Sequence, residues 1–256
     1  MLKEERQEQI IRFLQDRDYC SAVLLSKTLY ASLPTIRRDL ADLEKKGYIR
    51  RCRGGAVLLD ANRPDTPFPF RLSTHTLEKN QLCLLAATLV ADGDVVFIDE
   101  STTTQYMVEC LRHRQDLTVI TNSIAVCNLL YQSNIKTYCT GGCLQNSSCS
   151  FVGRQAEKYM ADFNVDYAFF STSALNEEGL VTDYFEEGTH LRQAVFEHAR
   201  KKVLLCDHSK LGKNAAYTVC RLQDLDYMAT DFDTGTDFSG FYQTMSKNGC
   251  FLFSKA

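Results

Sequence analysis

The placement of proline is the feature that most constrains the fold of this chain. The sequence has 256 residues and four prolines, and three of these, Pro64, Pro67 and Pro69, lie within six residues of one another. Each proline lacks a backbone N–H and restricts the residue before it, so residues 60–70 cannot form a helix interior or a central strand. This segment is predicted to be an extended linker between two domains. No proline follows it.

The net charge of −3 conceals two parts of opposite charge. Residues 1–60 carry twelve Lys/Arg and nine Asp/Glu, whereas the rest of the chain carries seventeen Lys/Arg and twenty-three Asp/Glu. Within residues 27–53, eight basic residues stand against three acidic ones. A compact basic segment on an acidic body indicates a module that binds a polyanion. A solvated charged face is the alternative, and charge alone does not exclude it.

Residues 1–59 are predicted to form a winged helix-turn-helix domain. Apolar residues at helical spacing predict the first helices. Ser32 is a favourable N-cap for the third helix, and Pro34 lies early in that helix, where its missing N–H costs nothing. The predicted elements are helices at residues 3–15 and 22–29, a third helix that ends at Gly47, and a β-hairpin at residues 48–59 that forms the wing.

The third helix carries a basic face suited to the major groove of DNA. Ile36, Leu40 and Leu43 recur at helical spacing and anchor the opposite face. Arginine is a permanently charged fork that fits guanine edges or phosphates, and arginines on the wing would meet the DNA backbone. A small helical domain with a basic surface is the alternative interpretation. We predict that a double-stranded DNA operator is contacted by Thr35, Arg37, Arg38, Arg51 and Arg53.

Residues 71–256 alternate short apolar runs with helical stretches, which predicts an α/β domain with a parallel sheet covered on both faces. The segment after Asp231 is either a last strand or an oligomer contact. Strands are predicted at residues 95–99, 117–121, 136–140, 166–171, 202–207 and 226–231, and helices near residues 77–91, 101–112, 123–132, 154–162 and 187–200.

Polar residues follow several of these predicted strands, at the edge where parallel α/β sheets bind ligands. After the first strand, two carboxylates are followed by four hydroxyl residues that open a helix, and such a turn can cradle a phosphate. The alternative is that the hydroxyls only cap the helix. Small, amide and cationic residues recur after the second, third and fifth strands. The predicted effector-binding residues are Asp99, Ser101, Thr102, Thr103, Thr104, Thr121, Asn122, Gly141, Gly142 and Lys210.

Residues 34–57 (PTIRRDLADLEKKGYIRRCRGGAV) and these strand-end motifs resemble the DeoR-type (deoxyribose-operon-repressor) family over nearly the whole chain. The resemblance implies a winged helix joined to a sugar-phosphate-isomerase-like sensor domain. It further implies a regulator, usually a repressor, of a carbohydrate-metabolism operon, controlled by a phosphorylated sugar or related metabolite. A homo-oligomer, dimer or tetramer, would present its winged helices to repeated half-sites.

The sequence departs from the family pattern at several positions. Arg53 stands where the family usually has histidine, which keeps a hydrogen-bond donor on the wing. Ser101 replaces an expected glycine, and its side chain narrows the approach of a phosphate to the backbone. Residues 171–174 (STSA) replace a glycine-containing segment, and Glu187 only loosely matches an expected acidic residue. These departures predict an unusual effector.

An isomerase-like enzyme is the main alternative function. Asp99, Glu100, Asp207 and Lys210 are the candidate acids and bases, but their arrangement would serve binding equally well. An enzyme has no use for an arginine-faced winged helix, so a regulator rather than an enzyme is predicted. The clustered polar residues also argue against a pure scaffold.

No nucleotide-binding glycine motif is present, so no cofactor is expected. The chain has no apolar run of the roughly 20 residues that span a membrane and no signal peptide, which predicts a cytoplasmic protein without membrane contact. Its eleven cysteines contain no C-x-x-C pair. They are interpreted as small buried hydrophobes rather than as a metal site or disulfide framework.

Overall fold

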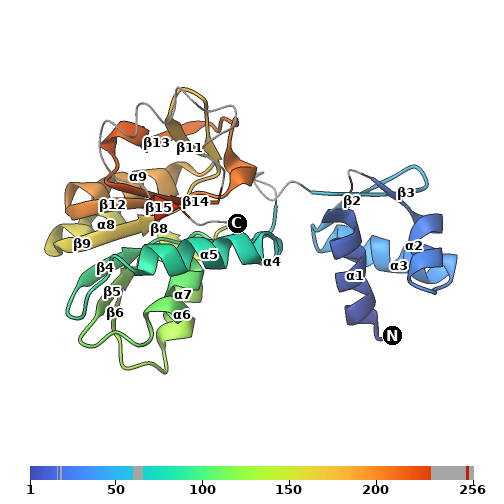
Figure 1. Ribbon diagram of the computed structural model, residues 1–256, viewed down its shortest axis with the longest axis horizontal. Coiled ribbons are helices and arrows are strands. Elements are labelled where there is room, and N and C mark those ends of the chain that lie inside the picture. Colours follow the sequence, from blue (N-terminus) through green and yellow to red (C-terminus); the bar gives the residue numbers. More distant parts are fainter. Residues whose placement is uncertain (16, 18, 60–65, 232–251, 254–256) are drawn as a thin grey trace. The chain divides into compact units, whose positions relative to one another are not determined.

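The structure is a computed structural model, and it describes residues 1–15, 17, 19–59 and 66–231 together with the backbone of residues 252–253. Its internal contacts divide the chain into two compact units, Met1–Thr74 and His75–Ala256 (Figure 1). Among the described residues, no helix combines the length and apolar character needed to cross a membrane.

The first unit is a three-helix winged domain, as the sequence predicts. Ser32 is the N-cap of the third helix, and its Oγ accepts a hydrogen bond from the Thr35 N–H at 3.3 Å. Gly47, with φ +74°, follows the end of this helix in the left-handed region. The elements are α1 (Lys3–Gln15), α2 (Ala22–Thr28), α3 (Leu33–Lys45) and the antiparallel pair β2 (Ile49–Cys52) and β3 (Gly55–Leu58).

A two-residue strand that the sequence analysis missed completes the wing. β1 (Cys20–Ser21) pairs antiparallel with β3. Gly55 allows this pairing, because a Cβ at that position would lie 2.1 Å from the carbonyl oxygen of Cys20. The wing is therefore a three-stranded sheet.

One buried ion pair joins α1 to α3. Asp39 lies on α3 and is almost fully buried, yet the sequence analysis gave it no role. Arg6 of α1 donates from Nε to Asp39 Oδ2 at 2.5 Å and from Nη2 to Oδ1 at 3.2 Å. This two-pronged contact fixes both position and orientation. The ion pair therefore fixes how α1 lies against α3, next to an apolar core that contains Ile36, Leu40 and Leu43.

The structure corrects the C-terminal part of the predicted linker. Phe68–Ser73 form a helix, α4, with Pro67 as its N-cap and Pro69 in its first turn. Proline is compatible with a helix at this position, because the first N–H groups have no intrahelical partner. Phe70 is buried and meets the Tyr48 ring edge-on at 5.3 Å between centroids. Residues 66–74 therefore belong to the first unit, whereas residues 60–65 lie outside the described residues.

The second unit is built on a seven-stranded parallel sheet with strand order β15-β14-β12-β9-β4-β5-β6. All six predicted strands are confirmed. The seventh, β15, supports the last-strand interpretation of the tail, of which residues 232–251 lie outside the described residues. The strands are β4 (Val95–Ile98), β5 (Thr118–Thr121), β6 (Lys136–Cys139), β9 (Val165–Phe170), β12 (Ala199–Leu205), β14 (Tyr227–Thr230) and β15 (Leu252–Phe253).

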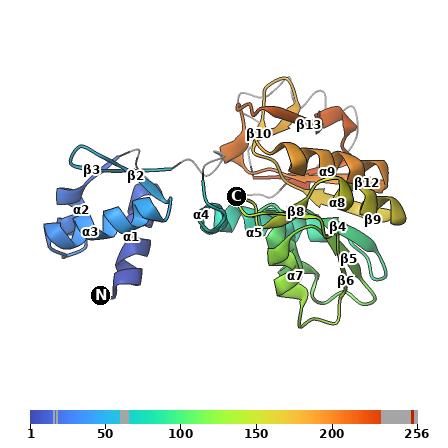
Figure 2. The ribbon, with the colours of Figure 1, turned by 180° about the vertical axis from the view of Figure 1, so that it is seen from behind.

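Helices cover both faces of this sheet (Figures 1 and 2). The side chains of β4 alternate between the two faces: Val96 and Ile98 pack toward one helical layer and Phe97 toward the other. The first layer contains α5 (Thr76–Ala87), α6 (Met107–Leu111), which follows a short 3-10 turn at Thr104–Tyr106, and α7 (Ile124–Leu130). The second contains α8 (Arg154–Tyr159) and α9 (Glu186–Glu197).

Two small antiparallel sheets were not predicted. Their strands have two to five residues each and lack the long apolar runs of the parallel sheet. β10, β11 and β13 contribute to a core with Phe170, Leu204 and Met228. The first of these sheets contains β7 (Cys143–Gln145) and β8 (Ser150–Val152), and the second contains β10 (Ala174–Leu175), β11 (Leu180–Asp183) and β13 (Tyr217–Arg221).

Candidate functional site

The outer face of α3 presents two of the predicted DNA-contacting arginines to solvent. Arg37 and Arg38 are exposed, whereas Ile36, which precedes them on α3, is fully buried. Thr35 is half-buried, and its hydroxyl lies 2.8 Å from Ser32 Oγ. The Thr35 side chain therefore belongs to the helix cap. The side chains of Arg37 and Arg38 are exposed to solvent on the same turn.

The wing arginines differ from each other. Arg51 is held by Glu44 of α3: its Nε lies 2.6 Å from Glu44 Oε2, and its backbone N–H donates to Oε1. These hydrogen bonds lower the pKa of Glu44. Arg53 is exposed near the wing tip, where the Tyr19 hydroxyl donates to its carbonyl oxygen at 3.2 Å. The tip is thus anchored while the Arg53 guanidinium stays at the surface.

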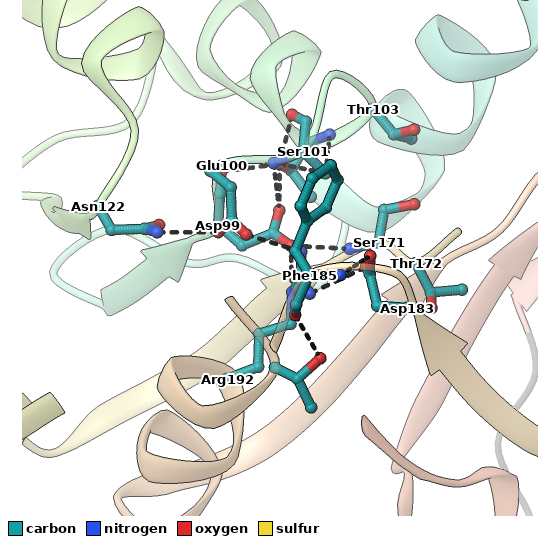
Figure 3. Close-up of polar contacts among 12 residues, drawn as sticks. Asp99, Glu100, Ser101, Thr103, Asn122, Ser171, Thr172, Asp183, Phe185 and Arg192 are labelled. Atoms are coloured by element: carbon teal, nitrogen blue, oxygen red, sulfur yellow. Dashed lines mark hydrogen bonds and ion pairs between the residues drawn. The ribbon is translucent and has the colours of Figure 1, made fainter. Parts of the chain in front are cut away.

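In the second unit, one buried guanidinium contacts three carboxylates at the carboxyl ends of strands (Figure 3). Arg192 of α9 donates from Nε to Asp99 at 2.9 Å, from Nη2 to Glu100 at 2.9 Å and from Nη1 to Asp183 at 3.0 Å. All four side chains are at most 5% exposed. We call Arg192, Asp99, Glu100 and Asp183 the arginine cluster.

Burial and charge oppose each other in the arginine cluster. Burial disfavours the charged form of Arg192, but the carboxylates of Glu100, Asp183 and Asp99 outweigh it and raise the arginine pKa. Burial is the largest effect on Glu100 and raises its pKa, although Arg192 and Asn122 partly counteract it. One guanidinium therefore faces three acids, and Glu100 is the acid whose ionisation the site disfavours.

The predicted ligand group Asp99 is engaged inside the protein. Its Oδ1 accepts from the Ser101 N–H at 3.0 Å and the Thr104 hydroxyl at 2.6 Å. Its Oδ2 accepts from Arg192 and from the Ser171 N–H at 3.2 Å. In this structure, Asp99, Ser101 and Thr104 form a capped turn that positions Thr102 and Thr103 between them.

Two buried lysines flank that turn. Lys79 of α5 donates to the Thr102 hydroxyl at 3.3 Å, and Lys210 donates to the Thr103 hydroxyl at 3.2 Å. Lys79 is 4% exposed and Lys210 6%, so both ammonium groups are withdrawn from bulk water. The Lys210 Nζ also lies 3.3 Å from Asp207 Oδ2. We call Lys79, Thr102, Thr103, Lys210 and Asp207 the lysine cluster.

The lysine cluster contains two ammonium groups and one carboxylate, and Lys210 lies next to that carboxylate. Burial alone would raise the pKa of Asp207, but Lys210 and a hydrogen bond from Ser209 outweigh it and lower that pKa. Asp207 therefore stays ionised. Two buried ammonium groups beside two hydroxyls supply hydrogen-bond donors that suit an anion.

Two imidazoles lie beside this cluster. His75, with φ +51°, precedes α5, and its ring meets the His208 ring edge-on at 5.5 Å between centroids. Burial lowers the pKa of His75. Burial acts in the same direction on His208, but its hydrogen bond to Asp231 outweighs it and raises the pKa.

Ser171 connects the two clusters. Its backbone N–H donates to Asp99, and its hydroxyl accepts from Lys210 Nζ at 2.7 Å while donating to the Leu205 carbonyl. The serine belongs to the STSA segment at residues 171–174 that departs from the family pattern. Its side chain thus has a definite place in the site.

The remaining predicted effector residues lie on the β5–β6 side of the sheet. Thr121 donates to the Ile98 carbonyl at 2.7 Å, and Asn122 donates to Glu100 Oε2 at 2.9 Å. Gly141 and Gly142 follow β6, and strands β5, β4 and β9 lie between β6 and β12, the strand that leads to Lys210. Asn122 therefore joins the arginine cluster, whereas the glycines follow a strand that is separated by three others from the strand leading to Lys210.

Sequence reasoning assigned no role in the site to Arg192, Asp183 or Lys79. A signal for Arg192 was available: it occupies a helical position between the fully buried Leu191 and Val195, where a charge requires a buried partner. Gly188, one turn earlier, leaves room for that partner. A Cβ at position 188 would lie 2.7 Å from Glu100 Oε1.

Comparison with known proteins identifies the family. The profile of the DeoR-like helix-turn-helix domain matches residues 6–62, and that of the DeoR C terminal sensor domain matches residues 74–232. The chain belongs to the DeoR family. It is 34% identical over 234 residues to the HTH-type transcriptional repressor GlcR of Bacillus subtilis, covering 90% of this chain and 89% of that one.

A second DeoR-family relative is the glycerol-3-phosphate regulon repressor of Escherichia coli, 28% identical over 232 residues and covering 90% of this chain and 92% of the relative. Among solved structures, ribose 5-phosphate isomerase A of Methanocaldococcus jannaschii matches 52% of this chain and 53% of its own at 20% identity, with a TM-score of 0.40. The DeoR-family chain described here is a transcription regulator rather than an enzyme, as the sequence predicts.

Proposed function

We propose that this DeoR-family regulator represses a carbohydrate-metabolism operon and responds to a phosphorylated sugar or related metabolite held by the lysine cluster. The observation that carries the proposal is the pair of buried ammonium groups, Lys79 and Lys210, each hydrogen-bonded to a threonine hydroxyl. A phosphate accepts several charge-assisted hydrogen bonds, and ammonium and hydroxyl groups are the donors that supply them. The printed name of one relative, glycerol-3-phosphate regulon repressor, supports the same ligand chemistry.

The DNA-reading part of the proposal rests on α3 and the wing. The exposed guanidinium groups of Arg37 and Arg38 stand on a helix whose other face is anchored by buried leucines and isoleucine. Arg53 projects from the wing. We assign base-edge or phosphate contacts to the two helix arginines and backbone contacts to the wing.

Regulation follows from linkage between the two ligands. A homo-oligomer, dimer or tetramer, would present winged helices to repeated operator half-sites. An effector that binds better to one arrangement of the sensor units shifts the population toward that arrangement. The size of the response is limited by the difference between the two affinities.

The test is thermal unfolding of the full chain with a panel of sugar phosphates and their unphosphorylated counterparts. A ligand that binds only the folded state at a hundredfold excess over its Kd adds about 2.7 kcal/mol to stability. We expect a dose-dependent rise in midpoint for at least one phosphorylated sugar and none for its unphosphorylated form. If none of the phosphorylated compounds raises the unfolding midpoint, the assigned ligand class is wrong.

Two variants locate the binding site. Lys210→Gln removes one buried ammonium, and we expect it to abolish the shift in midpoint. Lys158→Gln removes an exposed ammonium from α8 and serves as the matched control. A shift that survives in Lys210→Gln, or disappears in both variants, would place the ligand elsewhere.

A further inference from the structure

The turn between α2 and α3 contains a residue whose backbone conformation does not suit its side chain. Tyr30 has φ +49°, which lies in the left-handed region. It follows Leu29, the C-cap of α2, and the Ala31 N–H donates to the Ser26 carbonyl at 3.2 Å, which is the long hydrogen bond of a Schellman motif. The motif requires a left-handed residue at the position of Tyr30, and glycine is the residue that usually occupies it.

The hydrogen bonds of the turn explain its conformation but not the choice of tyrosine. The Ser26 hydroxyl donates to the Ala31 carbonyl at 2.6 Å, so the turn is held without the Tyr30 side chain. The left-handed conformation is unfavourable for an ordinary L-residue, because its Cβ lies too close to the following carbonyl oxygen. Histidine and aspartate, which adopt positive φ at His75 and Asp116, are among the types that tolerate it better, whereas tyrosine is not.

The Tyr30 side chain contributes little to the packing of the first unit. It is 96% exposed, the highest value among the exposed large hydrophobic side chains of the described residues. Within the part of the chain that the structure describes, its hydroxyl has no hydrogen-bond partner. A strained residue whose side chain does nothing for the fold points to a function outside the fold.

The turn adjoins the helix that carries the DNA-reading arginines. Tyr30 lies two residues before Ser32, the N-cap of α3, and Arg37 and Arg38 are exposed in the following turns of that helix. In helix-turn-helix proteins the N-terminal residues of the second helix contact base edges in the major groove, and the first helix crosses the backbone. The residues that join the two helices therefore lie near the phosphates that border the groove. Tyrosine is one of the side chains that donate hydrogen bonds to such phosphates.

We propose that Tyr30 is a further DNA-contacting residue, and that its hydroxyl donates a hydrogen bond to a backbone phosphate next to the start of α3. The contact carries no charge and reads no base, so it positions α3 on the duplex without selecting the sequence. The turn is less stable with tyrosine than with glycine, and the gain appears only when DNA is bound. This inference rests on the DNA-binding part of the proposed function and does not depend on the effector.

The experiment compares Tyr30→Phe and Tyr30→Gly with the parent chain by fluorescence anisotropy, on duplexes that the parent chain selects from a random pool. Both variants should bind about tenfold more weakly, because each loses a hydrogen bond to a charged acceptor. The slope of log affinity against log salt should not change, since an uncharged contact releases no counterion. Tyr131→Phe removes the hydroxyl of an exposed tyrosine of the second unit and is the matched control, with the affinity of the parent chain.

Thermal unfolding separates this role from a structural one. Glycine adopts the left-handed conformation without strain, so Tyr30→Gly should raise the unfolding midpoint of the first unit by a few degrees while it weakens DNA binding. Tyr30→Phe keeps both the ring and the strain, and its midpoint should equal that of the parent chain. A structural role for the side chain would instead lower the midpoint of Tyr30→Gly together with its affinity.

Several outcomes would overturn the assignment. Parent-like affinity in Tyr30→Phe would exclude the phosphate contact, and a lowered midpoint in Tyr30→Gly would show that the side chain serves the fold. A changed salt slope in Tyr30→Phe would mean that cationic contacts, rather than the hydroxyl, account for the loss. A parent chain that selects no duplex would overturn the proposed DNA binding and this contact with it, whereas equal binding by parent and variants overturns the contact alone.

Discussion

The two units of this chain use arginine in opposite ways. In the first unit, Arg37 and Arg38 extend from α3 into solvent, where they do little for the fold. In the second, Arg192 is buried against three carboxylates and is part of the fold itself. An exposed arginine contributes energy when a polyanion arrives, and salt weakens that contribution. A buried arginine contributes continuously, because its removal leaves uncompensated charges in the interior.

The largest expected effect tests the buried side of this comparison. Arg192→Met leaves Asp99, Glu100 and Asp183 buried without their cation, and we expect a loss of roughly 3–5 kcal/mol in the free energy of unfolding. Arg112→Met, which removes an exposed arginine paired with Glu109, is the matched control and should change the midpoint little. Equal midpoints for the two variants, measured by denaturant unfolding, would break the comparison.

The next effect tests the exposed side. Arg37→Ala should weaken operator binding by about 1–3 kcal/mol if the guanidinium reads a base edge, without a change in the midpoint of the sensor unit. If Arg37 contacts a phosphate instead, the slope of log affinity against log salt should fall by about one. Arg12→Ala removes an exposed arginine from α1 as a control of equal charge. Fluorescence anisotropy on duplexes selected from a random pool gives both quantities, and a variant that loses sensor stability would contradict the separation of roles.

A smaller effect is expected at the cap that orients α3. Ser32→Ala removes the hydroxyl that accepts from the Thr35 N–H and should cost about 1 kcal/mol of stability in the first unit. Ser32→Gly, which frees the backbone to be solvated, should cost only about a few tenths of a kcal/mol. The two variants are compared by thermal unfolding. An equal loss in both would show that the hydroxyl does not act as the cap.

The smallest effect concerns the protonation of Glu100. Burial raises its native pKa above the unfolded value near 4.5, so the native state binds this proton more tightly. The resulting stability is fully present below the unfolded pKa and is lost as pH rises through the raised native pKa. Glu100→Gln cannot titrate, and its stability should therefore decline less than that of the parent chain as pH rises from 4.5 toward neutrality. Parallel curves for the two proteins would contradict the role assigned to burial.

Most of the helices and strands that were predicted correctly follow from short local patterns in the sequence. Ser32, Pro34 and the spacing of Ile36, Leu40 and Leu43 predict α3 because a cap and an apolar stripe act within a few turns. The six strands predicted for the parallel sheet were accessible to local reasoning too, since most of them contain a short apolar run next to polar residues. β7, β8, β10, β11 and β13 escaped because their pairing, rather than their composition, makes them strands.

The candidate site was only partly predictable, since its contacts are long-range. Thr102, Thr103 and Lys210 were expected at strand ends, and the structure brings them together. Their order in the sequence does not show that Lys79 lies on the other side of the same turn. Arg192 reaches Asp99 across 93 residues and Glu100 across 92, a distance in sequence over which spacing carries no information.

Gly188 has a consequence for how this protein and its relatives can diverge. The Glu100 carboxylate occupies the space where a side chain at position 188 would begin. If Gly188 is replaced first, the new side chain displaces the buried Glu100 carboxylate. If Glu100 is replaced first by a smaller residue, space becomes available for a side chain at position 188 of α9. The two positions, 88 residues apart in the chain, therefore constrain each other's substitutions in evolution. A lineage that changes Gly188 is expected to have replaced Glu100 beforehand.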